Sequence, residues 1–207
     1  MPDSTEIIGG LATASNDWKL LAIAWHAYVA ALLIIMALAI RPSYRWVGAA
    51  LVLPLLSVSA IAWKTRNPFN GAVFGVGAAL LLLVAAGLPR VRIEPAPKLW
   101  LAAGSVLVVF GWCYPHFLKS GSPLEYLYAA PLGLIPCPTL SMLAGVTMML
   151  HGLGSARWSL LVAVMGMFYG LFGALHLGVR IDWVLSAGAL GLFALYFLEM
   201  RRARGVA

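Results

Sequence analysis

The residues of this chain that are best suited to chemistry lie between Gly111 and Thr139. This segment reads GWCYPHFL, then a short polar link, then PLGLIPCPTL. It holds both cysteines of the chain, one of its four histidines and five of its twelve prolines. Thiols and imidazoles bind metals and carry protons, and prolines break helices. Because hydrocarbon penalises free backbone amides and polar side chains, such residues inside apolar stretches indicate a site.

The elements that must position these residues are transmembrane helices. The chain has 207 residues, of which 62% are hydrophobic and 10% charged, whereas soluble domains carry about 25% charged residues. Apolar stretches of about 20 residues recur, each long enough to span a hydrocarbon core about 30 Å thick. We therefore predict an all-α, polytopic integral membrane helix bundle with about seven transmembrane helices. The expected spans are residues 18–40, 46–63, 71–88, 99–118, 130–150, 158–178 and 183–200.

The loops between these spans are short, which predicts a single transmembrane domain over residues 18–200. Residues 1–17 form an extracytoplasmic N-terminal segment in this scheme, and residues 201–207 a basic cytoplasmic tail. The N-terminal segment is acidic and has no basic residue, whereas a cleavable signal peptide needs a positive start. Ser15, Asn16 and Asp17 are typical cap residues and are expected to begin the first helix.

The net charge of +7 is better explained by membrane orientation than by nucleic-acid binding. With seven spans, the larger group of basic residues shares one side, and the positive-inside rule makes that side cytoplasmic. We therefore predict a multi-pass protein of the bacterial inner membrane with its N-terminus outside and its C-terminus in the cytoplasm. That group is Arg41, Arg45, Arg90, Arg92, Lys98, Arg157, Arg201, Arg202 and Arg204; Lys19, Lys64, Arg66, Lys119 and Arg180 lie on the other side.

Alternating spans bring most of the reactive side chains to one level, in the outer leaflet. Tyr114 and Asp182 are expected at that level, whereas His151 lies at the opposite end. The candidate ligands of a metal ion at this level are Cys113, His116, Cys137, His26 and His176.

Several interpretations of these side chains stay open. Cys113 and Cys137 could form a disulfide in an oxidising compartment, or bind a soft ion such as Cu(I) or Zn(II) with the histidines. No CxxC or HxxxH spacing supports the metal. His26 and His176 come from two helices and could hold a haem iron as axial ligands. Each histidine also fits a structural role near the interface, and neither a metal nor a haem is required.

The Pro136-Cys137-Pro138 element predicts a kinked or unwound fifth helix. A proline inside a helix cannot donate its amide and clashes with the carbonyl four residues earlier. Two prolines around one thiol would free carbonyls beside Cys137, and Thr139 and Ser141 could satisfy some of them.

Glycines spaced along two of the expected helices give small-residue faces that allow close helix approach. Packing within the bundle and a homo-oligomer interface explain them equally well. The glycines are Gly71, Gly75, Gly77, Gly166, Gly170 and Gly173.

Three segments resemble an uncharacterised family of bacterial multi-pass membrane proteins, catalogued as a domain of unknown function. They are residues 67–82 (NPFNGAVFGVGAALLL), 111–115 (GWCYP) and 131–139 (PLGLIPCPT). The resemblance covers roughly residues 46–196 and rests on a Tyr-Pro and a Pro-Cys-Pro-Thr element. In the family pattern a further Thr often follows, whereas Leu140 stands here. The resemblance implies an α-helical inner-membrane protein and supplies no activity or site residues.

The sequence therefore favours an integral membrane protein that handles or transports a small solute or metal ion through an outer-leaflet site. One alternative is a non-catalytic membrane subunit or assembly factor of a larger complex; another is a haem-binding redox protein. The expected partners are the lipid bilayer and either further copies of the chain or a membrane complex. An enzyme is least favoured, because no acid–base pair has a suitable spacing. No expected span carries Asp, Glu, Lys or Arg in its central part, which argues against ion-coupled transport.

Overall fold

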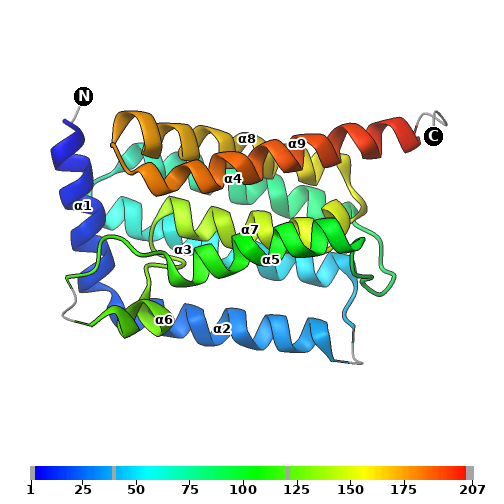
Figure 1. The fold of residues 1–207 in the computed structure, drawn as a ribbon, viewed down its shortest axis with the longest axis horizontal. Coiled ribbons are helices and arrows are strands. Elements are labelled where there is room, and N and C mark those ends of the chain that lie inside the picture. The colour runs from blue at the N-terminus through cyan, green and yellow to red at the C-terminus, as the bar shows by residue number, and fades with distance from the viewer. Residues whose placement is uncertain (1–2, 39–40, 120–121, 204–207) are drawn as a thin grey trace.

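The computed structural model describes residues 3–38, 41–119 and 122–203, and this part of the chain is all-α (Figure 1). Short 3₁₀ turns at Pro123–Glu125, His151–Gly154 and Arg180–Asp182 and a π-helical turn at Phe172–His176 join some of the helices. The α-helices are α1 (Ser4–Asp17), α2 (Lys19–Ala37), α3 (Tyr44–Lys64), α4 (Pro68–Gly87), α5 (Lys98–Cys113), α6 (Tyr126–Ala129), α7 (Pro136–Met149), α8 (Ala156–Leu171) and α9 (Trp183–Ala203).

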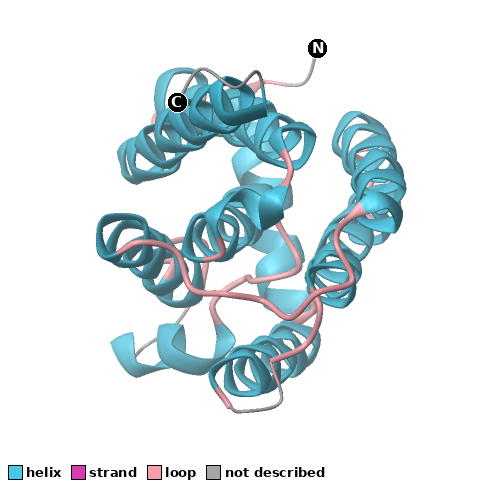
Figure 2. Cartoon of the chain, turned by 90° about the vertical axis from the view of Figure 1, so that its right-hand side faces the viewer, coloured by secondary structure: helices cyan, strands magenta, loops and turns pink. Residues whose placement is uncertain are grey.

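The helices that match the expected spans lie along the long axis of the molecule, and successive ones run in opposite directions (Figure 1). Figure 2 shows this bundle nearly end-on, with loops crossing the near face. Helix α1 lies across the end of the bundle at which α2, α4 and α9 begin (Figure 1). Within the bundle, α7 packs against α3, α5, α8 and α9. Its residues 138–148 are all buried, so α7 is the central helix.

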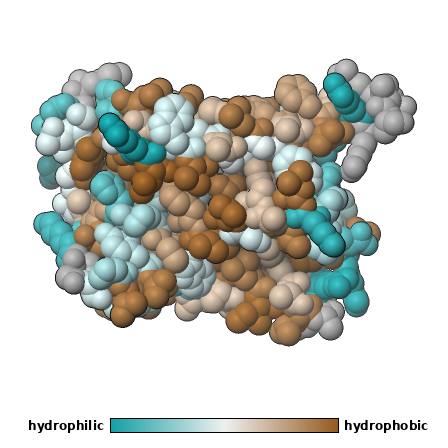
Figure 3. Space-filling view, in the orientation of Figure 1, coloured by the Kyte–Doolittle hydropathy of each residue, from teal (hydrophilic) through white to brown (hydrophobic). Residues whose placement is uncertain are grey.

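Five helices of the described part are long and apolar enough to cross a membrane. Hydrophobic side chains cover the middle of the visible face, and hydrophilic ones gather toward its two ends (Figure 3). The length and composition of these helices therefore confirm the prediction of a multi-pass membrane protein. The number of seven spans and the orientation in the membrane stay predictions. The five helices that could cross a membrane are Lys19–Ala37, Tyr44–Lys64, Pro68–Gly87, Ala156–His176 and Arg180–Arg201. Residues 39–40, at the expected end of the first span, and 204–207 of the expected tail lie outside the described residues.

The fourth and fifth expected spans are shorter helices than the sequence predicted. Helix α5 ends at Cys113 rather than at Leu118, because Pro115 disfavours helical geometry at Tyr114, whose φ of −36° and ψ of 105° are not helical. Helix α7 begins at Pro136 rather than at residue 130. The chain before it turns through Gly133, whose φ of +72° needs a residue without Cβ beside the Trp25 ring.

The predicted kink at Pro-Cys-Pro is wrong, because both prolines lie in the first turn of α7. Pro136 is the first helical residue, where a missing amide hydrogen costs nothing. The Thr139 hydroxyl donates to Ile135 O at 2.8 Å and accepts from Gly133 N at 2.9 Å, which fastens the entering chain to the helix. Pro-Cys-Pro-Thr therefore starts a helix.

The prediction that Ser15, Asn16 and Asp17 begin the first helix is also wrong. These residues end α1, and α2 starts two residues after Asp17, at Lys19. The actual cap of α1 is Asp3, which forms a capping box with Glu6.

The small-residue faces are filled by neighbouring helices of the same chain. A Cβ on Gly71 would meet the Trp63 ring, and one on Gly77 would meet Met165. Helices α5 and α7 bring their backbones close together: a Cβ on Gly104 would lie 2.5 Å from Gly145 O, and one on Gly145 2.6 Å from Gly104 O. Packing within the bundle therefore explains these glycines.

Substitution of Gly145 by Ala should destabilise the bundle by about 1–3 kcal/mol, because the methyl group meets the α5 backbone rather than a flexible side chain. The melting temperature, followed by tryptophan fluorescence of the purified protein, measures the effect. Gly87→Ala is the matched control, since nothing lies within 4 Å of its added Cβ. Equal melting temperatures for the two variants would contradict this packing.

Candidate functional site

The structure does not bring the five expected metal ligands together. The described residues contain no group of three or more His, Cys, Asp or Glu that could hold a metal ion. Cys137 and His176 line one cavity at the α1 end of the bundle, whereas His26, Cys113 and His116 do not line it. His116 packs edge-on against Phe117, with ring centroids 4.3 Å apart. The metal site of the sequence analysis stays a prediction that the geometry does not support.

His26 joins α2 to α5 through its ring. Its Nδ1 lies 2.8 Å from Ala22 O and its Nε2 lies 3.0 Å from Trp112 O, and the side chain is buried. An axial haem ligand must direct a ring nitrogen at the iron, whereas both nitrogens of His26 face carbonyl oxygens. This histidine has a structural role in the geometry observed.

Both cysteines are free thiols, so the predicted disulfide alternative is not formed. The Cys137 thiol instead donates to Oδ2 of Asp182 at 3.2 Å, and the Tyr114 hydroxyl donates to Oδ1 at 2.8 Å. Two donors from other parts of the chain thus share the Asp182 carboxylate. Asp182 is 1% exposed, and it has no Lys or Arg partner in the part of the chain that the structure describes.

The local backbone makes room for this carboxylate. Helix α8 ends in the π-helical turn Phe172–His176, and such turns occur often at functional sites. Gly173 lies in that turn, and a Cβ on it would overlap Asp182 Oδ2. The chain then returns through Gly178, at φ +71°, so that Val179 N donates to Gly173 O at 2.9 Å. Asp182 follows directly, at the entrance of α9.

A second buried polar pair lines the same cavity. The Tyr169 hydroxyl donates to Asn70 Oδ1 at 2.9 Å, and the Asn67 side chain caps α4 by accepting from Asn70 N at 3.1 Å. Asn70 is 8% exposed. Its amide nitrogen has no partner among the described residues, and the side chain lines the cavity. Asn70 therefore keeps unused hydrogen-bond donors for a bound molecule.

The cavity itself has a volume of about 580 Å³, within the range of about 300–1,000 Å³ that is usual for ligand sites. A smaller cavity of about 320 Å³ shares Asn67, Asn70 and Pro136 with it. Most of the wall is apolar, and the buried polar groups are confined to a small part of it. The lining residues are Asp3, Ser4, Ile7, Leu11, Asn67, Phe69, Asn70, Phe117, Ile135, Pro136, Cys137, Phe168, Tyr169, Phe172, Gly173, His176, Leu177 and Asp182.

Aromatic rings form a continuous part of this wall. Phe168, Phe172 and His176 follow one another at four-residue spacing on α8 and its π-helical turn, and so share one face. Phe168 and Phe172 have ring centroids 6.0 Å apart, and Phe172 and His176 4.8 Å apart. Phe69 of α4 extends the row, at 5.9 Å from Phe168.

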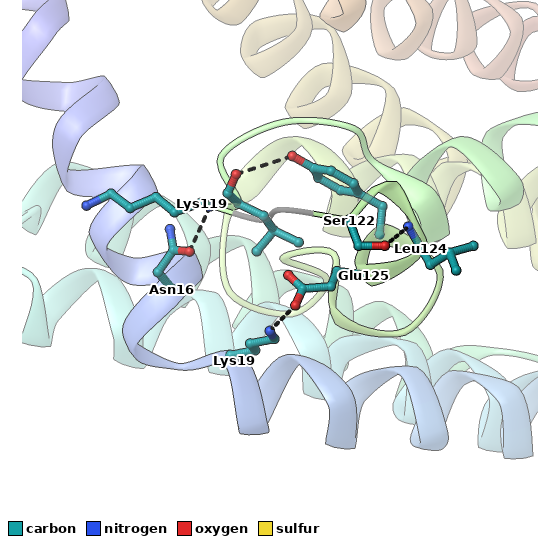
Figure 4. Close-up of polar contacts among 8 residues, drawn as sticks. Asn16, Lys19, Lys119, Ser122, Leu124 and Glu125 are labelled. Carbon is teal, nitrogen blue, oxygen red and sulfur yellow. Dashed lines mark hydrogen bonds and ion pairs between the residues drawn. The ribbon is translucent and has the colours of Figure 1, made fainter.

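Helix α1 covers one side of the cavity with Ile7 and Leu11. Its C-terminal end is fastened: Asn16 Oδ1 accepts from Lys119 N at 2.9 Å (Figure 4). At the start of α2, Lys19 forms an ion pair with Glu125 at 2.8 Å. The part of α1 over the cavity contributes the apolar side chains Ile7 and Leu11, and its first turn is closed by its own capping box.

No protein-family model matches the chain, and neither the curated proteins nor the solved structures contain a match to it. Fold and composition therefore define the class, a helical protein of the multi-pass membrane type, and identify no family within it. The resemblance based on the Tyr-Pro and Pro-Cys-Pro-Thr elements stays a prediction.

Sequence reasoning missed Asn70, Tyr169 and the aromatic row as parts of the site. Two patterns could have revealed them. The NPFN tetrapeptide places Asn70 in the first turn of a helix, where an amide is an unusual choice in an apolar span. The spacing of Phe168, Phe172 and His176 puts three rings on one helix face.

Loss of the Tyr114 hydroxyl in Tyr114→Phe should destabilise the protein by about 1–3 kcal/mol, because Asp182 Oδ1 is left buried with no donor. The melting temperature measures the change. Tyr126→Phe is the control, because the Tyr126 hydroxyl makes only a long contact of 3.5 Å to Leu118 O. If Tyr114→Phe and the control have equal melting temperatures, the hydrogen bond from Tyr114 to Asp182 does not contribute to stability.

The cover formed by α1 should loosen when its cap is removed. In a Cys113→Ser background, where Cys137 is the remaining thiol, Asp3→Ala should raise the rate at which N-ethylmaleimide modifies Cys137 about two- to tenfold, because an N-cap holds the first turn. Thr13→Ala, an exposed position on the same helix, should leave the rate unchanged.

Acid should have the same effect as Asp3→Ala. Hydrogen bonds from the Thr5 hydroxyl, and then from the amide and hydroxyl of Ser4, lower the pKa of Asp3 below its ordinary value of 3.8. The cap is therefore complete above that value and is lost as the pH falls through the lowered pKa. A pyridyl disulfide, which reacts with thiols in acid, should show a rise in Cys137 labelling there that Asp3→Ala abolishes.

Proposed function

We propose that this chain is an integral membrane protein that binds a small amphipathic molecule in the cavity beneath α1. The observation that carries the proposal is a mainly apolar cavity of about 580 Å³ with hydrogen-bonding side chains confined to its inner wall. Ligand sites have this composition: apolar walls contribute affinity, and a few polar groups set the orientation.

The polar group of the ligand would lie against Cys137 and Asp182, and Asn70 would donate to any acceptor atom beside it. Asn70 offers free amide hydrogens, and Cys137 is half-buried because its thiol borders the cavity. Tyr169 and Asp182 position these two side chains through hydrogen bonds. The apolar part of the ligand would lie against Ile7 and Leu11 of α1. The solute-handling role in the sequence analysis thus takes the form of binding, without a metal ion.

The chemistry of the site favours binding over catalysis. The Cys137 thiol is already engaged by a carboxylate, and no histidine of the described chain is within hydrogen-bond distance of it. A cysteine nucleophile is usually activated by an adjacent general base such as histidine. The role of a subunit in a larger complex stays an alternative; its test is co-purification of a stoichiometric partner.

The proposal predicts that a ligand protects Cys137 from modification. Cys113→Ser protein in lipid nanodiscs is treated with N-ethylmaleimide, and intact mass follows the reaction with and without octyl compounds of different head groups. At least one compound should slow the labelling of Cys137 about tenfold at saturation, because a bound molecule occupies the space in front of the thiol.

Cys137→Ser is the matched control, since its remaining thiol, Cys113, does not line the cavity. The labelling of Cys113 should be unaffected by the same compounds, which separates cavity binding from general effects on the bilayer. Failure of every octyl compound to protect Cys137 would overturn the proposal.

A further inference from the structure

Two carboxylates line the cavity, and among the described residues that line it His176 is the one side chain able to carry a positive charge. Asp3 lies at the mouth and Asp182 at the inner wall, and no Lys or Arg is among the described residues that line it. The whole chain, by contrast, has 14 basic and 7 acidic residues. The wall of the cavity is thus richer in acidic than in basic residues, unlike the chain as a whole. Such a wall would complement a positively charged ligand.

The aromatic rings supply a second attraction of the same sign. A ring presents a negative face, and cations bind over such faces, most strongly where water is excluded. Phe69, Phe117, Phe168, Tyr169 and Phe172 all line the cavity together with the carboxylates. Rings combined with a carboxylate are the chemistry by which proteins recognise organic ammonium groups.

The inner carboxylate is placed where a cation would need it. Asp182 accepts one neutral hydrogen bond at each oxygen, from Tyr114 and Cys137, and each oxygen keeps a further lone pair. Buried charges in proteins are usually paired. Asp182 has no Lys or Arg within ion-pair distance among the described residues, so a positive partner from outside would satisfy it.

We propose that the ligand of this cavity is a cationic amphiphile, an organic ammonium with an apolar tail, with its positive group held between Asp182 and the Phe168–Phe172 rings. This inference rests on the proposed function and adds the charge of the ligand. The neighbouring basic side chain, Arg66, lines the smaller adjoining cavity and not this one. Lys19 at the same end is paired with Glu125.

Four octyl compounds that share one chain length but differ in charge test which ligand charge the cavity prefers. Octylamine, octyltrimethylammonium, 1-octanol and octanoate are titrated against Cys113→Ser protein in nanodiscs of neutral lipid, with protection of Cys137 from N-ethylmaleimide as the readout. Half-protection should need about tenfold less of the better ammonium compound than of 1-octanol, and octanoate should protect least. Each concentration is corrected for partition into protein-free nanodiscs.

Asp182→Asn should remove most of this preference, so that the ammonium compound and 1-octanol differ by less than about threefold. Phe172→Leu should reduce it while keeping an apolar wall. Protection is expressed relative to the unprotected rate of the same variant, which cancels any change in the reactivity of the thiol. Phe197→Leu, an exposed position on α9 outside the cavity, should keep the full preference.

The outcomes separate the two proposals. Equal protection by all four compounds, or strongest protection by octanoate, would overturn the cationic ligand and leave the binding function standing. A preference for ammonium compounds that persists in Asp182→Asn would overturn the assigned role of Asp182. Absence of protection by any compound would overturn the binding function and this inference together.

Discussion

A buried carboxylate that the chain supplies with hydrogen-bond donors determines the arrangement at the α1 end of this bundle. Asp182 is 1% exposed, and a buried charge without donors would cost several kcal/mol. Its donors come from the residue after the end of α5 and from the second residue of α7. Besides these two donors the carboxylate needs space, which Gly173 provides because it has no side chain. The ends of three helices are therefore tied to one side chain.

The cavity follows from the same arrangement. Helices α5 (16 residues) and α7 (14 residues) are shorter than α3, α4 and α9 (20 or 21 residues), and they stop short of the end of the bundle that α1 covers (Figure 1). The entering chain before α7 turns inward at Gly133. Space remains between this turn, α8 and α1, and it is bordered by the polar groups that the helix ends bring with them. A central helix such as α7, buried along nearly its whole length, can end inside the protein only where such groups satisfy its first turn.

The sequence predicted the positions of the five helices that are long and apolar enough to cross a membrane, because each one is a separate apolar run and hydropathy detects such runs directly. It failed at the ends of the two central helices. Residues 114–118 and 130–135 are apolar enough to count as span, but Pro115 and Gly133 give them another backbone geometry. The sequence predicted that most of the reactive residues lie near one end of the bundle. It did not predict in which direction each side chain points around its helix axis. His26 and Cys137 thus lie near the same end of the bundle but face different neighbours. Helix α1 was missed although its Asp3…Glu6 capping box can be read from the sequence.

The net charge of the chain gives little information about which ligand this site selects. Exposed charges more than about 10 Å apart are largely screened by salt, whereas charges inside an apolar wall act with little screening. Most of the described basic residues are exposed in loops or near helix ends, as Arg90, Arg92 and Arg180 are, so their effect on the cavity is weak. Asp182 lies at the inner wall beside aromatic rings, where desolvation strengthens its field. A strongly basic protein can therefore contain a site that prefers cations, provided that the acidic group of the site is buried and the basic side chains are exposed.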